Sequence, residues 1–251
     1  DKNFIFFVVK YNEDFDFQVI YKDLIKSEGI TNGKIVDQNI SSKILKDKLN
    51  FIEKKINFTF KNATIISDQE NYNCINASGF KKLKGSQILE EDISYILNNV
   101  KKLITDNEPN KSLIHLFNTS YILDKNILNN LPIGLHGDFY NHHLTFFLLP
   151  KNDIKNLKLV LNSCDLEIER VILKPFAQGL YEIKKNKNNN KLFLINLNKK
   201  KTSISIFNNL SFIFSQHFEF GTDIIMKDVS KLCSLAIETV EDIFKEINLN
   251  S

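Results

Sequence analysis

The segment that most constrains the fold consists of two apolar stretches joined by a lysine-rich turn. Residues 192–197 and 203–207 are largely apolar and rich in β-branched and aromatic residues, and Asn198-Lys199-Lys200-Lys201 lies between them. This pattern predicts a β-hairpin. The backbone N–H groups of such a turn approach a phosphate closely when the turn is built from glycines, which have no Cβ. No glycine is present here, so the sequence predicts a hairpin whose turn does not suit the binding of a phosphate.

Composition places the chain among ordinary globular proteins with a sizeable core. Of its 251 residues, 43% are hydrophobic and 25% are charged. The net charge is only +3, and Arg170 is the sole arginine. Because arginine is the side chain that reads phosphates and guanines bidentately, nucleic acid is not an expected partner.

The cysteines indicate neither a disulfide framework nor a metal centre. Cys74, Cys164 and Cys233 are three in number and widely separated, without a C-x-x-C pair. We expect buried free thiols in a reducing cytosol. No apolar run approaches 18 residues, and the first nine residues lack a basic segment and a cleavage site, so we expect neither export nor a membrane span.

The first eighty residues predict an α/β layer. Hydrophobic periodicity and turn residues give its elements in order: a β-hairpin of Phe4–Val9 and Phe15–Tyr21 around Tyr11–Asp14, a turn at Gly29 and Gly33, an amphipathic helix Gln38–Ile56, and a short buried strand Ala63–Ser67.

The next segment predicts a compact α+β module inserted into that layer. Glu90, Glu91 and Asp92 place carboxylates at a helix start, where the helix dipole favours them. The elements expected after this helix are strands at Leu113–Phe117 and His143–Leu149, a turn-rich crossing Leu131–Gly137 and a helix Asp153–Cys164.

The last third predicts a return to the first layer and then a sheet with one long helix. We expect a strand Val171–Leu173, a short helix Pro175–Tyr181, a linker Lys184–Lys191, strands at 192–197, 203–207 and 211–218, and a regular amphipathic helix Asp228–Ile247.

Six blocks in order make the chain resemble the FtsA family, actin-like proteins of bacterial cell division that tether FtsZ filaments to the membrane. The blocks are Ser27–Asp37, Glu90–Ile93, Pro132–Gly137, Leu173–Ala177, Asn196–Phe207 and Phe220–Asp223. They resemble the family's S-x-G-I-x-x-G-x-I-V-D, E-E-D-I, P-V-G-x-x-G, L-E-P-L-A, phosphate-hairpin and V-G-G-D segments.

The resemblance implies an α/β fold of actin-like (ribonuclease H-like) subdomains with an inserted α+β module of the SHS2 type. Residues 1–79 and 159–185 would form the first actin-like subdomain, residues 80–158 the inserted module, and residues 186–251 the start of a second subdomain. The family's opening phosphate loop would lie before Asp1 or be lost. Its FtsZ-binding subdomain and its terminal membrane helix would lie after Ser251.

The departures from the family lie where nucleotide chemistry would occur. The family's hairpin aspartates fall on Asn196 and Ser203, its glycines on Asn198, Lys199 and Lys200, and its first threonine on Lys201. Thr202 alone matches, and it is the one candidate cofactor-binding residue. Asn and Ser have no charge with which to organise a metal-bound water, so we expect no hydrolysis and no catalytic residue. Weak ATP binding through the lysines remains an open alternative.

The other conspicuous residues have structural explanations that we prefer. A lysine run in a turn is usually a solvated surface. Adjacent strand residues point to opposite faces, so His142 and His143 do not converge on a metal ion. Gly134 and Gly137 suit a turn before a strand. The 21 phenylalanines are expected in the core, with an exposed sheet edge of the inserted module as the exception.

The sequence thus favours a non-catalytic, FtsA-like scaffold of the divisome, acting through contacts with other cell division proteins, such as FtsZ-ring components, and with itself. It would lie in the cytoplasm, on the inner membrane at the division site, with membrane contact through a further segment or a partner. The alternatives are a PilM-like adaptor for pilus assembly, an active ATPase or kinase of the actin superfamily, and an unrelated α/β interaction domain.

Overall fold

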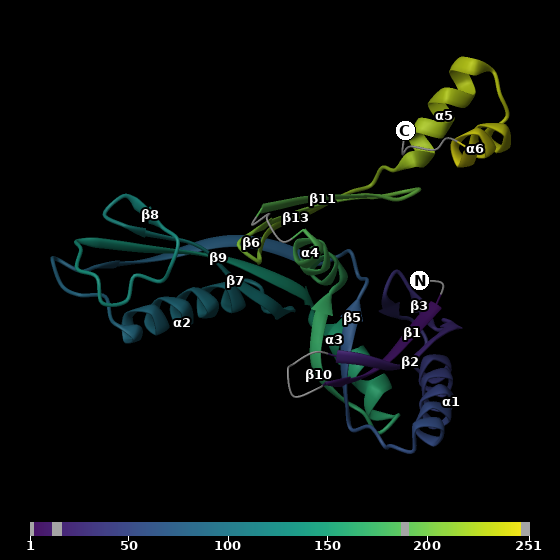
Figure 1. Ribbon diagram of the computed structural model, residues 1–251, viewed down its shortest axis with the longest axis horizontal. Coiled ribbons are helices and arrows are strands. Elements are labelled where there is room, and N and C mark those ends of the chain that lie inside the picture. The colour runs from purple at the N-terminus through teal and green to yellow at the C-terminus, as the bar shows by residue number, and fades with distance from the viewer. Residues whose placement is uncertain (1–2, 12–16, 187–190, 247–251) are drawn as a thin grey trace.

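The chain forms a mixed α/β structure with several small sheets. The computed structural model describes residues 3–11, 17–186 and 191–246. In Figure 1, α1 and the first strands lie on one side, the sheet covered by α2 on the other, and α5 and α6 project from the far end of β11–β13.

The elements follow one another along the chain with short connections. In order they are β1 (Asn3–Tyr11), β2 (Phe17–Lys26), β3 (Ile30–Thr31), β4 (Lys34–Ile35), α1 (Gln38–Ile56), β5 (Asn62–Ser67), β6 (Asn73–Lys82), α2 (Glu90–Asn107), β7 (Lys111–Leu123), β8 (Asn126–Leu128), β9 (Phe139–Pro150), α3 (Lys151–Asn162), β10 (Glu167–Leu173), α4 (Lys174–Lys185), β11 (Lys191–Leu197), β12 (Thr202–Asn208), β13 (Ser211–Phe218), α5 (Thr222–Cys233) and α6 (Ile237–Glu246).

The predicted first hairpin and first helix are both present. β1 and β2 pair in antiparallel fashion, although residues 12–16, and with them most of the predicted turn, lie outside the described residues. The Asp37 carboxylate caps α1 by accepting from the N–H of Ile40 at 3.0 Å. The helix ends at Asn57, whose left-handed φ of 56° stops further helical hydrogen bonding.

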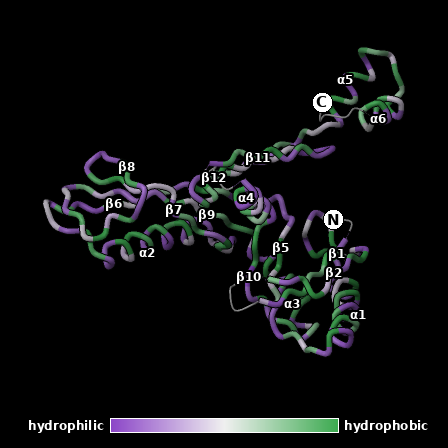
Figure 2. Tube along the Cα trace, in the orientation of Figure 1, coloured by the Kyte–Doolittle hydropathy of each residue, from purple (hydrophilic) through white to green (hydrophobic). Residues whose placement is uncertain are grey.

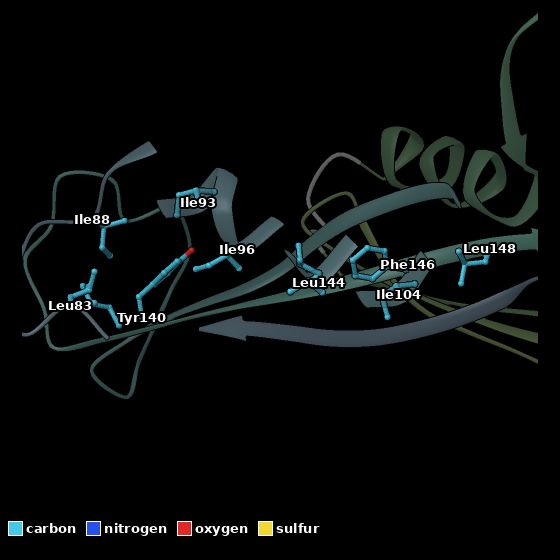
Figure 3. Packing of buried hydrophobic residues seen from close by; sticks show 11 residues of the cluster. Leu83, Ile88, Ile93, Ile96, Ile104, Tyr140, Leu144, Phe146 and Leu148 are labelled. Atoms are coloured by element: carbon cyan, nitrogen blue, oxygen red, sulfur yellow. The ribbon is translucent and has the colours of Figure 1, made fainter. Parts of the chain in front are cut away.

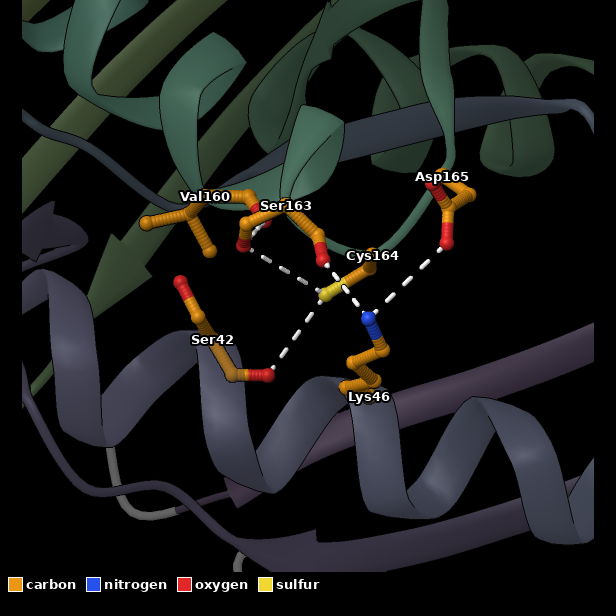
Figure 4. A network of polar contacts seen from close by, with 6 residues as sticks. All are labelled: Ser42, Lys46, Val160, Ser163, Cys164 and Asp165. Atoms are coloured by element: carbon orange, nitrogen blue, oxygen red, sulfur yellow. Dashed lines mark hydrogen bonds and ion pairs between the residues drawn. The ribbon is translucent and has the colours of Figure 1, made fainter.

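Two strands that are far apart in the sequence pair with each other. β5 and β10 pair in parallel, so β6, α2, β7, β8, β9 and α3 are all contained in the connection between them. The end of α3 is held against α1. The carbonyl of Ser42 accepts from the Cys164 thiol at 3.5 Å, and Lys46 Nζ donates to the Ser163 carbonyl at 3.3 Å (Figure 4).

The central sheet has the antiparallel order β6-β9-β7-β8, and α2 covers one of its faces. Apolar side chains of α2, including Ile96 and Val100, pack onto Leu144, Phe146 and other buried residues (Figure 3). Gly79 allows this close approach, because a Cβ there would lie 2.6 Å from a methyl carbon of Ile96. Asp92, predicted at the start of α2, accepts from the Leu89 N–H and pairs with Lys81.

The other face of this sheet packs against β11–β13 and α4 through aromatic rings. Phe212 of β13 stacks between Phe147 of β9, at 4.2 Å between ring centroids, and Phe207 of β12, at 4.7 Å. All three side chains are fully buried. Gly179 brings α4 onto the Phe207 ring, which a Cβ would approach to 2.0 Å. These rings meet the expectation that phenylalanine builds the core, but Phe7, Phe51, Phe58 and several others outside the predicted module are largely exposed, so the expectation holds only in part.

Several sequence expectations are wrong. The final helix is broken, because Ser234 adopts a left-handed φ of 55° and the Ser230 hydroxyl donates to the Leu235 carbonyl, which separates α5 from α6. The strand predicted as buried, β5, has alternating exposure, with Ile66 largely open to solvent. Cys233 is exposed, whereas Cys164 is buried as expected.

Helix α4 also extends through Lys185, into the predicted linker, of which residues 187–190 lie outside the described residues. α5 and α6 also contain hydrophobic residues, which lie away from the cores of the central sheet and of the sheet β11–β13 (Figure 2). No helix in the described part of the chain is long and apolar enough to cross a bilayer.

Two buried imidazoles make the fold sensitive to acid. Burial lowers the pKa of His115 to about 4, and the ring accepts a hydrogen bond from the Leu173 N–H at 3.1 Å, which requires an unprotonated Nε2. Burial and, secondarily, the neighbouring His143 lower the pKa of His142 to about 4. Its Nε2 lies 2.9 Å from Asn118 Oδ1.

We expect the free energy of unfolding to fall as the pH drops from about 6.5 to about 4. Above that range the rings are neutral in both states. Within it, the unfolded chain takes up protons that the folded chain resists, so acid favours unfolding. Urea unfolding at a series of pH values measures this slope. His115→Gln should reduce it, and His136→Gln, which changes an exposed ring, is the matched control. An unchanged slope in His115→Gln would contradict this assignment.

Candidate functional site

A narrow polar cleft lies beside the turn of the β11–β12 hairpin. Its volume is about 80 Å³, and it is lined by the β5–β6 connection, the start of α4 and the inward faces of β11–β13. Asn196, Ser203 and His217 form one row across the three strands, because Ser203 is the register partner of both of the others. Gln178 of α4 faces this row, with Nδ2 of Asn196 3.4 Å from its Oε1.

The hairpin turn is closed by the chain's own backbone. The Asn198 N–H donates to the Lys201 carbonyl at 2.9 Å. The carbonyls of Asn198 and Lys199 accept from the N–H groups of Thr222 at 3.0 Å and Asp223 at 2.9 Å. These two donors belong to the first turn of α5, the position at which a helix offers its free N–H groups to an anion. In this chain they are occupied by the turn.

Gly221 makes this contact sterically possible. A Cβ at this residue would lie 2.1 Å from the Asn198 carbonyl oxygen and 2.4 Å from the Lys199 carbonyl oxygen. Both obstacles are backbone atoms, which cannot rotate away. The glycine of the Phe220–Asp223 block therefore serves the junction between the turn and α5.

Two of the three turn lysines pair with carboxylates. Lys201 Nζ lies 2.9 Å from Glu70 and 3.3 Å from Glu219, and its hydrogen bond to Glu70 is the main cause that raises its pKa. Lys199 Nζ lies 3.1 Å from Glu241 of α6. Lys200 is exposed. The positive charge that sequence alone assigns to this turn is thus largely compensated within the chain.

Comparison with known proteins finds similarity to FtsA proteins. FtsA of Buchnera aphidicola (subsp. Acyrthosiphon pisum) is 20% identical over 217 residues, which are 86% of this chain and 51% of that protein. FtsA of Neisseria meningitidis is 18% identical over 215 residues, again 86% and 51%. The chain is thus similar to FtsA proteins, at about 20% identity. It spans about half the length of the curated relatives it matches, and no family model matches it.

The fold comparison agrees with the actin-like α/β fold expected from the sequence. The PilM–PilN type IV pilus biogenesis complex aligns with 98% of this chain and 67% of the compared chain, at a TM-score of 0.59 and 8% sequence identity. At this identity the likeness concerns the fold alone.

The predicted cofactor residue is turned away from the cleft. Thr202 is buried, and its hydroxyl donates to the Phe220 carbonyl at 2.8 Å. Its role toward a nucleotide stays a prediction. The hydroxyl instead helps to fix the segment that leads from β13 into α5.

His217 is the polar group of the cleft that sequence reasoning missed. Its ring packs edge-on against Tyr72 at 4.8 Å, and within the described residues neither ring nitrogen has a hydrogen-bond partner. Burial lowers the pKa of this imidazole, which favours the neutral ring. Burial also raises the pKa of Tyr72, whose hydroxyl lies 2.6 Å from Ser215 Oγ. Strict alternation along β13 would place His217 on the face opposite to that of the buried Phe212, and the register shift between their two pairs, which the sequence does not reveal, brings His217 to the inward face.

The remaining candidates lie apart from the cleft. His142 and His143 are in the central sheet, and Gly134 and Gly137 are in the loop before β9. No group of three or more potential metal ligands occurs among residues 3–11, 17–186 and 191–246.

We expect Gly221→Ala to detach α5 from the hairpin turn, at a cost of about 1–3 kcal/mol for the overpacked contact. Amide hydrogen exchange at Thr222 and Asp223 should accelerate, because their acceptors are displaced. Phe220→Ala, which leaves the backbone contact in place, is the matched control. Unchanged exchange at both amides in Gly221→Ala would contradict the close approach described above.

Proposed function

We propose that this chain is a non-catalytic, FtsA-like scaffold of bacterial cell division. The matches to FtsA proteins and the actin-like fold support this role. In this proposal the scaffold acts on the cytoplasmic face of the inner membrane at the division site. It contacts other cell division proteins, such as FtsZ-ring components, and further copies of itself. Its membrane contact comes from a partner or from a further segment of the protein.

We further propose the domain division expected from the family. Residues 1–79 and 159–185 form a first actin-like subdomain, residues 80–158 an SHS2-type inserted module, and residues 186–251 the start of a second subdomain. The parallel pairing of β5 with β10 around the intervening sheet supports an insertion.

The closed hairpin turn is the observation that carries the non-catalytic part of the proposal. A phosphate bound at this turn would have to displace the carbonyls of Asn198 and Lys199 from the amides of α5. It would also compete with Glu70, Glu219 and Glu241 for the lysines. The cleft beneath measures about 80 Å³. Pockets for drug-sized ligands are several times larger, roughly 300–1,000 Å³.

An exposed aromatic pair supports contact through the central sheet. Phe80 of β6 and Phe139 of β9 are diagonal neighbours on the same side of the sheet, because Phe139 is opposite Lys82. Their rings stack at 5.4 Å with planes 14° apart. Both rings are exposed. Exposed, clustered aromatic side chains are typical of protein-binding surfaces.

We expect no saturable binding of fluorescent ATP with Mg²⁺, measured by anisotropy with an intact nucleotide-binding FtsA as positive control. The amides of Asn198, Thr222 and Asp223 already donate within the chain, and Lys199 and Lys201 are already paired with carboxylates, so the phosphates would have to displace these contacts. Glu70→Ala releases one partner of Lys201 and tests whether this compensation matters. Saturable binding and stoichiometric ATP turnover by the unmodified chain would instead favour an active ATPase or kinase.

In cells depleted of the protein, we expect division to fail and a fluorescently tagged copy to gather at midcell. Phe80→Ala combined with Phe139→Ala should reduce midcell recruitment, because the aromatic contact surface is removed. Phe58→Ala, which changes an exposed ring on another part of the molecule, is the control. Normal division after depletion, together with a diffuse tagged protein, would contradict the cell division role.

The PilM–PilN likeness favours one alternative, a PilM-like adaptor for pilus assembly. Its test is a pull-down with short peptides from the cytoplasmic ends of pilus membrane proteins. Specific capture, in cells where division proceeds normally without the protein, would replace the division role by the pilus role.

A further inference from the structure

Cys164 lies in a cluster of nucleophilic and charged groups between α1 and the end of α3, and the proposed function uses none of them. Lys46 of α1 extends its amine toward the turn that follows α3. Its Nζ lies 3.3 Å from the Ser163 carbonyl oxygen and 3.9 Å from the Asp165 carboxylate (Figure 4). Both residues that flank Cys164 in the sequence therefore hold the Lys46 amine.

The thiol approaches the same part of α1 as the amine. Cys164 is only 4% exposed, and its Sγ donates to the Ser42 carbonyl at 3.5 Å. Ser42 precedes Lys46 by four residues, so the two residues are neighbours on one face of α1. In Figure 4 the Lys46 amine points toward the sulfur. A thiol and an amine from two separate helices thus meet at this contact.

The surroundings of the thiol act on its reactivity in both directions. Burial raises the pKa of Cys164, whereas the Ser163 hydroxyl, 4.0 Å from the sulfur, and the positive charge of Lys46 lower it. The thiolate is the form that reacts with peroxides. The hydroxyl and the amine therefore favour reaction at a position where burial alone would suppress it.

The nucleophile beside an oxidised Cys164 would be an amine. Peroxide converts a thiol to a sulfenic acid, which condenses with a nucleophile within reach. A second thiol is the usual nucleophile, but Cys74 belongs to β6 and Cys233 to α5. The Lys46 side chain is half exposed, and its flexible four-carbon stem allows the amine to move onto the sulfur.

We propose that hydrogen peroxide couples Cys164 to Lys46 through a sulfur–nitrogen bond, which forms a reversible cross-link between α1 and the end of α3. The proposal goes beyond the cell division role and does not rest on it. The covalent state of the chain is measured on the purified protein, so the two proposals succeed or fail separately.

The reaction balances with one peroxide. The Cys164 sulfur attacks a peroxide oxygen, the O–O bond breaks, and the hydroxide that leaves takes up the thiol proton as water. The unprotonated Lys46 amine then attacks the sulfur of the sulfenic acid. The S–O bond breaks, and the second hydroxide leaves as water with a proton of the amine. The sulfur loses two electrons, and the peroxide gains them. Two molecules of a cellular thiol reverse the coupling and become a disulfide.

The first test is the mass of the full chain after treatment with hydrogen peroxide. A Cys74→Ala, Cys233→Ser background leaves Cys164 as the sole thiol, so an internal disulfide is excluded. We expect the chain to lose the mass of two hydrogen atoms and to regain it with dithiothreitol. A tryptic digest should show the peptide of Lys46 joined to that of Cys164. The same joined peptide is expected from the unmodified chain. A digest of the oxidised unmodified chain without this joined peptide overturns the proposal.

The second test removes the amine and keeps its charge. Lys46→Arg leaves a cation beside the thiol, but a guanidinium stays protonated and does not attack sulfur. We expect the joined peptide to disappear and Cys164 to gain oxygen atoms, because an untrapped sulfenic acid proceeds to sulfinic acid. Lys43→Arg, at an exposed lysine of the same helix, is the matched control and should cross-link as before. A Cys164 cross-link that persists in Lys46→Arg contradicts the assignment of the nitrogen.

The third test uses the opposite effects of the two outcomes on stability. Lys46 and Ser163 are 117 positions apart, so a cross-link at this contact restricts a long segment of the unfolded chain. In the sole-thiol background we expect peroxide to raise the urea midpoint. In Lys46→Arg on the same background it should lower the midpoint, because a sulfinate places an unpaired charge at a buried position. A midpoint that falls to the same extent in both chains overturns the proposal.

Discussion

The stack of Phe147, Phe212 and Phe207 is the interaction on which the arrangement of the chain depends. It joins β9 of the central sheet to β13 and β12 of the neighbouring sheet, with ring centroids 4.2 Å and 4.7 Å apart. α4 reaches the same cluster over Gly179, so the connection from β10 to β11 is fixed at the same point. Stacked aromatic rings combine a large buried area with a defined geometry. The polar cleft lies beside this contact, where β11–β13 meet the β5–β6 connection.

The hairpin that resembles a phosphate loop in sequence gives several of its polar groups partners within the chain. Turn carbonyls occupy the first amides of α5, and carboxylates from three separate segments compensate Lys199 and Lys201. These segments are the β5–β6 connection, the end of β13 and α6. The turn therefore acts as a structural junction between them. In our account, the turn makes contacts within the chain in place of contacts with a ligand. This is the physical basis of the proposed scaffold role.

Local signals predicted much of the fold, and long-range contacts account for what they missed. The bounds of α1 were predicted to the residue, because a clear apolar period begins after Asp37, a good N-cap. The break between α5 and α6 was missed, because the apolar period continues past Ser234 and a single left-handed residue leaves no trace in it. The ion pair of Lys201 with Glu70 joins residues that no local pattern relates. Likewise, the exposure of β5 depends on which strands pair with it, and its own sequence does not determine that.

The most direct test of the closed turn is an amide NMR titration of isotopically labelled chain with Mg·ATP, following Thr222, Asp223 and the His217 ring. Our account predicts that these three signals stay unchanged while ATP is added. The two amides already donate to the turn carbonyls, and the nitrogens of the His217 ring are buried by the protein. Saturable shifts at Thr222 and Asp223 would show that phosphate displaces the turn carbonyls. In that case the hairpin would be a working nucleotide site, and the scaffold would be under nucleotide control.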